Sequence, residues 1–200
     1  MKWGEPVFGA EATVTYGLVN SRHDFADARN CTAIGPVQPI LFANEIDAAS
    51  FERELTHAFR AWENVSGIRF RPAASSETAD ILIGADLAER GWAHADVKYT
   101  STADGIHAIE RGIVCLSPAK SWKIGFGENP EAQDMKYTLT HEIGHAIGLN
   151  HASPRGQLMS FTYGENISEL QSGDVEGARI LYGAPREGMM AATLPEQADR

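Results

Sequence analysis

The segment from Thr140 to Gly164 reads THEIGHAIGLNHASPRGQLMSFTYG and contains three of the seven histidines of the chain. His141 and His145 stand four positions apart, so on a helix they lie on one face, about one turn from each other. Two imidazoles placed in this way can bind one tetrahedral zinc ion, whose nitrogen ligands lie at about 2.0–2.1 Å. The spacing therefore predicts a metal site on one face of a helix.

A third histidine, His151, can join this site only if the chain changes direction. Ten residues after His141, it would lie about 15 Å further along a continuous helix. Gly148 stands where the chain must turn back, because glycine enters the left-handed conformation without a Cβ penalty. The alternative is three unrelated histidines, and chance would produce this pattern roughly once in ten thousand chains of such composition.

Glu142 is not needed as a metal ligand, because three histidines are available. Its presence beside them predicts a catalytic site. Its carboxylate can hold a metal-bound water, take the proton as general base and return a proton to the leaving amine. Three histidine ligands leave one position open, whereas a structural zinc is more often closed by four protein ligands that include cysteine. Two alternatives stay open: a zinc-stabilised binding module without catalysis, and a zinc hydrolase of a non-peptide amide.

Composition narrows the class of protein. The chain has 200 residues, 43% of them hydrophobic, which predicts one globular domain with a buried core. A formal net charge of -10 argues against nucleic acid or an anionic membrane surface as partner. No apolar stretch approaches the roughly 18 residues of a membrane span, and the first residues lack the apolar core of a secretory signal.

The two cysteines leave two interpretations open. Cys31 and Cys115 could form one disulfide in an oxidising compartment, which would stabilise the fold by about 4 kcal/mol. Otherwise Cys115, within the apolar run GIVCLSP, is a small buried hydrophobic residue and the two thiols are free.

Turn residues and apolar periodicity divide the chain into elements. Runs rich in apolar, aromatic and β-branched residues predict strands at 12–19, 68–73, 79–86, 91–100 and 112–119. Residues 21–40, with their Gly and Pro, are predicted to form a long surface loop.

Helical periodicity marks three segments. They are residues 47–66, residues 131–149, and residues 172–182 with Ser172 as N-cap. This order of elements predicts an α+β domain with a mixed, twisted sheet over residues 1–183. Residues 184–200 lack periodicity and are predicted to be a flexible tail.

The motif HEIGHAIGLNH resembles the signature H-E-x-x-H-x-x-G-x-x-H of the metzincin zinc peptidases, which a methionine turn follows. QLMS supplies that turn, with Met159 either as the apolar floor beneath the metal or as an ordinary core residue. LMSFTYGENISELQSGDVEGARILYG most resembles the matrixins, the matrix metalloproteinase group, as do KWG…TVTYGLV and FERELTHAFRAWENVSGIRFR. The resemblance implies a zinc endopeptidase with a five-stranded sheet, two long helices, of which the second carries HEIGH, and a C-terminal helix.

Further residues take roles from this resemblance. Phe161 replaces the tyrosine that astacins and serralysins place two residues after the methionine, and Phe161 and Tyr163 are expected in the wall of the substrate pocket. A peptide or protein substrate is expected to add as a strand to an edge segment. That segment comprises Gly91, Trp92, Ala93, His94 and Ala95. The resemblance also implies a secreted or extracellular protein, and we expect a monomer.

Secondary metal sites are weaker expectations. His94 and His107 resemble two ligands of the structural zinc of animal matrixins, but the upstream ligands have no counterpart, and the alternative is ordinary strand or surface histidines. Asp104 beside Gly105 is a candidate for calcium binding.

Overall fold

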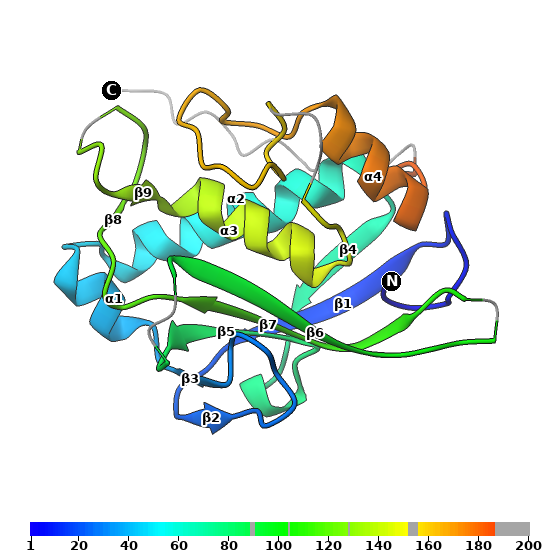
Figure 1. Ribbon diagram of the computed structural model, residues 1–200, viewed down its shortest axis with the longest axis horizontal. Coiled ribbons are helices and arrows are strands. Elements are labelled where there is room, and N and C mark those ends of the chain that lie inside the picture. The colour runs from blue at the N-terminus through cyan, green and yellow to red at the C-terminus, as the bar shows by residue number, and fades with distance from the viewer. Residues whose placement is uncertain (89–90, 104, 128, 152–155, 187–200) are drawn as a thin grey trace, which may run out of the picture.

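The computed structural model describes residues 1–88, 91–103, 105–127, 129–151 and 156–186, and Figure 1 shows its arrangement. Five long strands in the described part of the chain form a twisted sheet in the order β4–β1–β5–β7–β6. Their bounds are Ala12–Leu18 for β1, Ile68–Pro72 for β4, Ile81–Asp86 for β5, Ala93–Thr100 for β6 and Ala108–Leu116 for β7. The first four of this order are parallel, and β6 is antiparallel at one edge.

Four short strands complete the described sheets. β2 (His23–Asp24) pairs with β3 (Ala33–Gly35). β3 in turn pairs with Ala85 and Asp86 at the C-terminal end of β5, after the residues of β5 that pair with β1. β8 (Trp122–Lys123) and β9 (Gln133–Asp134) form a separate parallel pair.

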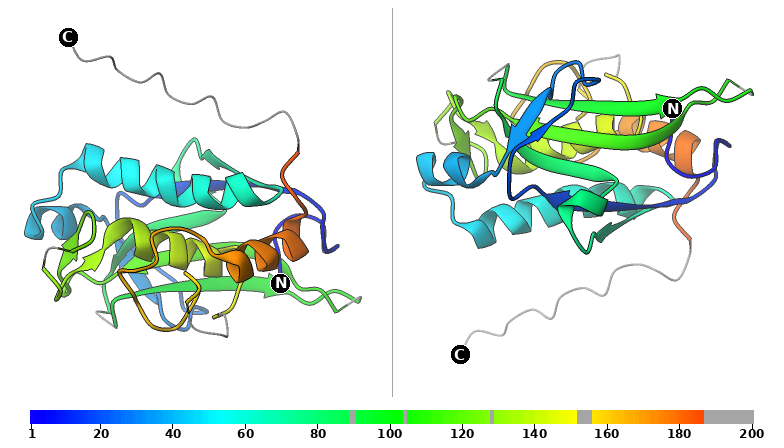
Figure 2. Two further views of the ribbon diagram at one scale, coloured as in Figure 1. Left: turned by 90° about the horizontal axis from the view of Figure 1, so that it is seen from above. Right: turned by 90° about the horizontal axis from the view of Figure 1, so that it is seen from below.

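Two long helices lie side by side on one face of the main sheet (Figures 1 and 2). They are α2 (Ala48–Val65) and α3 (Met135–Ala146). A hydrogen bond connects them, in which Trp62 Nε1 of α2 donates to the carbonyl oxygen of Thr140 of α3 at 2.9 Å. A short helix α1 (Gln38–Ala43), the 3-10 turn η1 (Ser76–Thr78) and helix α4 (Ser172–Tyr182) complete the described elements. Among these helices, none is both long and apolar enough to cross a membrane.

The predicted α+β class with a mixed sheet is confirmed, and most elements fall where the sequence places them. Asp47 caps α2 by accepting from the backbone N–H of Ser50, and the apolar stripe of this helix faces the core. β5 is buried along its whole length, as its apolar run predicts for a central strand.

Four details of the prediction are wrong. The predicted surface loop 21–40 contains β2, β3 and the start of α1, and buries Ile34 completely. Helix α3 begins four residues after the predicted start because Asp134 caps it, and β7 begins four residues before its predicted start. Gln171 rather than Ser172 caps α4, in a reciprocal capping box with Asp174. Of the predicted tail, residues 187–200 lie outside the described residues.

The chain segment before β3 is attached to the sheet by a covalent bond. Cys31 and Cys115 form a disulfide across 84 positions of sequence, and both side chains are fully buried. The disulfide ties this segment to β7, the strand next to the edge strand β6.

Candidate metal centre

Helix α3 carries the first part of the site and stops where the chain must turn. The carbonyl oxygen of Ala146, its last residue, accepts a bond from Trp3 Nε1 at 2.9 Å, and that of Ile147 accepts one from the Tyr182 hydroxyl at 2.6 Å. These side chains satisfy carbonyls that a helix end leaves without partners. Gly148 follows with a φ of 102°, which side chains rarely adopt, and the chain reverses there.

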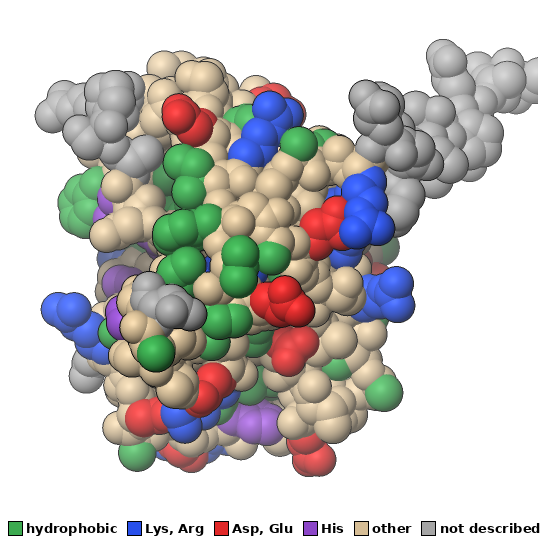
Figure 3. Space-filling model, turned by 90° about the vertical axis from the view of Figure 1, so that its right-hand side faces the viewer, with side chains coloured by type: hydrophobic (Ala, Val, Ile, Leu, Met, Phe, Trp, Pro, Cys, Tyr) green, Lys and Arg blue, Asp and Glu red, His purple; other side chains and the backbone are tan. Residues whose placement is uncertain are grey.

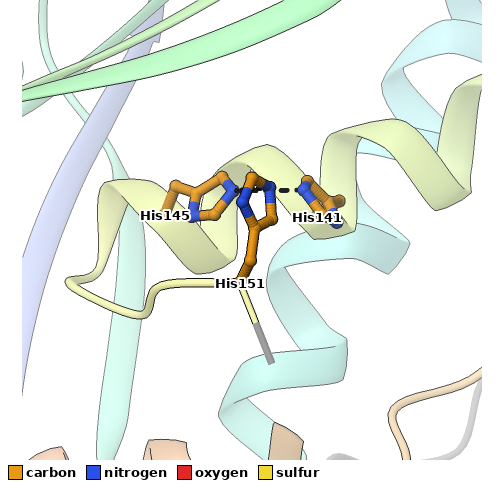
Figure 4. A group of neighbouring side chains, drawn as sticks. All are labelled: His141, His145 and His151. Atoms are coloured by element: carbon orange, nitrogen blue, oxygen red, sulfur yellow. Dashed lines mark hydrogen bonds between the residues drawn. The ribbon is translucent and has the colours of Figure 1, made fainter. Parts of the chain in front are cut away.

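The reversal brings the three predicted ligands together (Figure 4). The Nε2 atom of His145 lies 3.1 Å from the Nε2 atom of His141 and 3.1 Å from that of His151. One ligand atom from each histidine lies within 4.8 Å of the others. The three rings point towards one common position.

Hydrogen bonds set the protonation of two of these rings. His141 Nδ1 lies 2.9 Å from the carbonyl oxygen of Leu158, and His145 Nδ1 lies 2.9 Å from that of Leu149. A carbonyl only accepts, so each Nδ1 carries the proton and each neutral ring presents an Nε2 lone pair. Lone pairs 3.1 Å apart repel each other, and a cation between them removes this repulsion. The donor set therefore fits zinc, for which such orientation of histidines by carbonyls is usual.

Burial keeps the histidines neutral. Desolvation lowers the pKa of His145 to about 4, with a smaller contribution from the neighbouring His141. It also lowers the pKa values of His141 and His151. The rings are thus available as ligands at neutral pH without competition from protons.

Glu142 lies beside the triad in the same cleft and is 7% exposed. Loss of hydration on burial raises the pKa of its carboxyl to about 8. A nearby dication acts in the opposite direction, because it favours the carboxylate. A carboxyl group with these properties can exchange a proton near neutral pH.

Met159 packs against α3, which carries the candidate ligands His141 and His145, and its side chain is 1% exposed. It packs so closely on Gly144 that a Cβ atom there would overlap the Met159 sulfur. The carbonyl oxygen of the preceding Leu158 is the partner of His141 Nδ1. The methionine turn therefore orients the candidate ligand His141 as well as packing against the helix below the candidate metal position.

Asp174 holds this turn, and the sequence interpretation missed it. Its buried carboxylate accepts the backbone N–H groups of Leu158 at 2.8 Å, Met159 at 3.0 Å and Gln171 at 2.8 Å. The one sequence signal for Asp174 is its place three residues after the polar Gln171, at the start of a predicted helix. This pattern predicts a helix cap, and it gives no indication that Asp174 also binds a distant turn.

Two aromatic residues after the methionine line the cleft, as does a tyrosine of α3. Phe161 is 83% exposed, and its ring lies edge-on to that of His151 at 5.1 Å. The Tyr163 hydroxyl accepts from the backbone N–H of Asp134 and donates to Glu165, so it is engaged away from the ligands. Tyr137, which the sequence interpretation also missed, packs edge-on against Tyr163 at 4.7 Å.

The triad opens into a cleft of about 830 Å³ that runs along strand β6. In the described part of the chain β6 pairs only with β7, so its other edge is free. Of the predicted edge segment, Trp92, Ala93, His94 and Ala95 line the cleft, and Gly91 forms a turn just before them with a φ of 60°.

The secondary metal sites receive no support. The described residues contain one group of three or more side chains that could hold a metal, the triad, and neither His94 nor His107 belongs to it. His107 packs against Tyr99 with ring centres 4.8 Å apart. Asp104, the candidate for calcium binding, lies outside the described residues.

Comparison with known proteins gives a consistent result. A family model described as Matrixin matches residues 40–183. Metalloendoproteinase 5-MMP of Arabidopsis thaliana is 28% identical over 155 residues, which cover 73% of this chain and 43% of that protein. Stromelysin-3 of Xenopus laevis is 31% identical over 156 residues, 74% of this chain and 31% of that protein. Macrophage metalloelastase of Oryctolagus cuniculus is 29% identical over 147 residues, 68% of this chain and 30% of that protein. The chain thus spans less than half the length of these relatives.

Proposed function

Because this chain belongs to the matrixin family, we propose that it is a zinc-dependent endopeptidase whose ligands are His141, His145 and His151. The observation that carries the proposal is the convergence of their Nε2 atoms, two of them with the tautomer set by a backbone carbonyl. Zinc in such a site supplies a Lewis acid that lowers the pKa of water and polarises a carbonyl group.

Glu142 is the proton carrier in this proposal. Its carboxylate accepts a proton from the water molecule that attacks the peptide carbonyl carbon. The same carboxyl group then donates that proton to the amine nitrogen as the carbon–nitrogen bond breaks, which gives a carboxylic acid and an amine. The acid then loses its proton to the amine or to water. Burial beside the ligands, which raises its pKa, supports this exchange because the protonated form is then accessible.

The substrate is an extended peptide that adds along the free edge of β6. Main-chain hydrogen bonds to this edge would hold the peptide, and the cleft beside it would receive its side chains. Phe161 and Tyr163 form the wall on the side of the methionine turn. Neither offers a free hydroxyl to a developing oxyanion, so that stabilisation falls to backbone donors and the metal.

The domain bounds, the oligomeric state and the compartment of the protein are also part of the proposal. We propose that residues 1–183 form the catalytic domain, that it acts as a monomer and that it does so outside the cytosol. The buried disulfide between Cys31 and Cys115 supports the last point, since such bonds persist in oxidising compartments.

Substitution of Glu142 separates catalysis from metal binding. We expect zinc-loaded parent protein to cleave casein or a mixed-peptide substrate. The Glu142→Ala variant should retain one zinc per chain and lose activity by about 10²–10⁴-fold. Glu52→Ala, at an exposed position on α2, is the matched control and should retain activity. A parent protein that binds zinc but cleaves no peptide would instead favour a non-catalytic binding module or a hydrolase of another amide.

A further inference from the structure

A segment far from the histidines in sequence lines the same cleft. Asp27–Asn30, between β2 and β3, borders the cleft opposite α3, and we call it the lower lip. In the view from below in Figure 2, the blue segment between β2 and β3 crosses the green strands β6 and β7. In Figure 3 histidine side chains lie along the left-hand edge of the molecule, and basic side chains lie beside and below the lower of them.

The lower lip is fixed to the sheet at both of its ends. At one end, the Asp96 carboxylate of β6 accepts the backbone N–H groups of Asn30 and Cys31, both at 2.7 Å. The disulfide from Cys31 to β7 begins at the same point. At the other end, Arg111 of β7 donates to the Asp27 carboxylate at 2.6 Å. The lip is thus preorganised before any ligand binds.

The distance from His94 to the contacts between the lip and β6 follows from the spacing of residues along the strand. Asp96 lies two residues beyond His94, and Lys98, which pairs with Asp27 at 3.7 Å, lies four residues beyond it. At about 3.4 Å per residue, these contacts stand about 7 and 14 Å along the edge from His94. A peptide on this edge would run between the histidines of α3 on one side and the lip on the other.

We propose that the lower lip forms a distal subsite for an extended peptide. Counted from His94, the residue of β6 that interacts electrostatically with His145, it contacts substrate residues about two to four positions along the strand. These residues lie on one side of the scissile bond only, because β6 leaves the catalytic centre in one direction. The carboxylate of Asp27 already pairs with Lys98 and Arg111. The subsite therefore recognises the main chain and the length of the peptide rather than one charged side chain. This inference rests on the proposed peptidase function.

Two series of peptides test the subsite. Each begins from one short cleavable core, and one series is extended towards the N-terminus, the other towards the C-terminus. In Asp96→Ala, which releases the lip from β6, the kcat/KM ratio of long to short peptide should fall about tenfold in one series and stay constant in the other. Asp80→Ala is the matched control: its carboxylate also accepts two bonds of 2.7 Å, both from Thr15, and it does not line the cleft. Equal ratios in Asp96→Ala and Asp80→Ala, or the same fall in both series, would overturn the proposal.

A crosslinking measurement keeps the test independent of hydrolysis and of the folding of Asp96→Ala. A photoreactive amino acid replaces Ala28 of the lip in the Glu142→Ala background, and the same group replaces Glu52 as control. We expect the long peptide of one series to crosslink from position 28 and not from position 52. Absence of any crosslink from position 28 to a bound long peptide contradicts the subsite. If the parent cleaves no peptide, the proposed function fails, and crosslinking alone then decides whether the lip contacts a peptide.

Discussion

Asp174 supports the turn beneath the metal position, and its removal should weaken both the fold and zinc binding. In Asp174→Ala, three backbone N–H groups lose their acceptor, two of them in the methionine turn. An unsatisfied buried donor costs about 1–3 kcal/mol, and entering water or a backbone shift relieves part of this. We expect the free energy of unfolding to fall by about 3–5 kcal/mol, a large part of the 5–15 kcal/mol typical of a domain.

Zinc binding should fall with it, because the carbonyl oxygen of Leu158 orients His141 through its Nδ1 atom. Loss of such an outer partner typically reduces metal affinity about 10–100-fold. Urea unfolding and competition with a zinc-binding dye measure the two effects. Asp47→Ala, which removes the cap of α2, is the control and should cost about 1 kcal/mol without changing zinc affinity. If Asp174→Ala loses less than about 1 kcal/mol of unfolding free energy, or binds zinc as the parent does, Asp174 does not support the methionine turn in this way.

Three other perturbations have defined outcomes. Burial raises the pKa of Glu142 from 4.5 to about 8, so the fold disfavours its carboxylate. The contribution of Glu142 to the unfolding free energy of metal-free protein should therefore decrease as pH rises from about 4.5 to 8, whereas the histidines with lowered pKa values act in the opposite direction below about 6.5. The unfolding free energy of Glu142→Gln minus that of the parent should increase over this pH range, and equal slopes of the two proteins in urea unfolding would contradict this. Replacing both Cys31 and Cys115 by Ser should cost about 4 kcal/mol in the same assay, and a loss below about 1 kcal/mol would mean that the disulfide does not constrain the unfolded chain. Gly144→Ala should displace Met159, lower stability by about 1–3 kcal/mol and weaken zinc binding, whereas parent-like affinity would show that the methionine floor does not position the ligands.

The parts of the site that depend on helix geometry could be predicted from the sequence. His141 and His145 share a helix face because of their spacing alone, and a turn at Gly148 is the one way to return His151 to them. Asp174 could not be found in this way, because its partners lie 15 and 16 positions earlier and the contact exists only after α4 packs under the turn. Local patterns carry no information about such tertiary contacts.

The same distinction explains the errors in the fold. The strong periodicity of α2 predicts a helix, and its bounds differ from the prediction by one residue at each end. Residues 21–40 have no period because β2, β3 and the start of α1 are each too short to show one. Pairing with β5 and the disulfide of Cys31 bury this segment, so tertiary contacts override its loop-like composition.

The proposed function requires that a single zinc ion held by three histidines supports peptide hydrolysis. Stepwise addition of zinc to metal-free protein, with bound metal and peptide cleavage followed together, tests it most directly. We expect cleavage to rise in proportion to bound zinc and to level off at one zinc per chain, with no such rise in His145→Ala. Full zinc occupancy without peptide cleavage, or cleavage that does not depend on zinc, would contradict the claim.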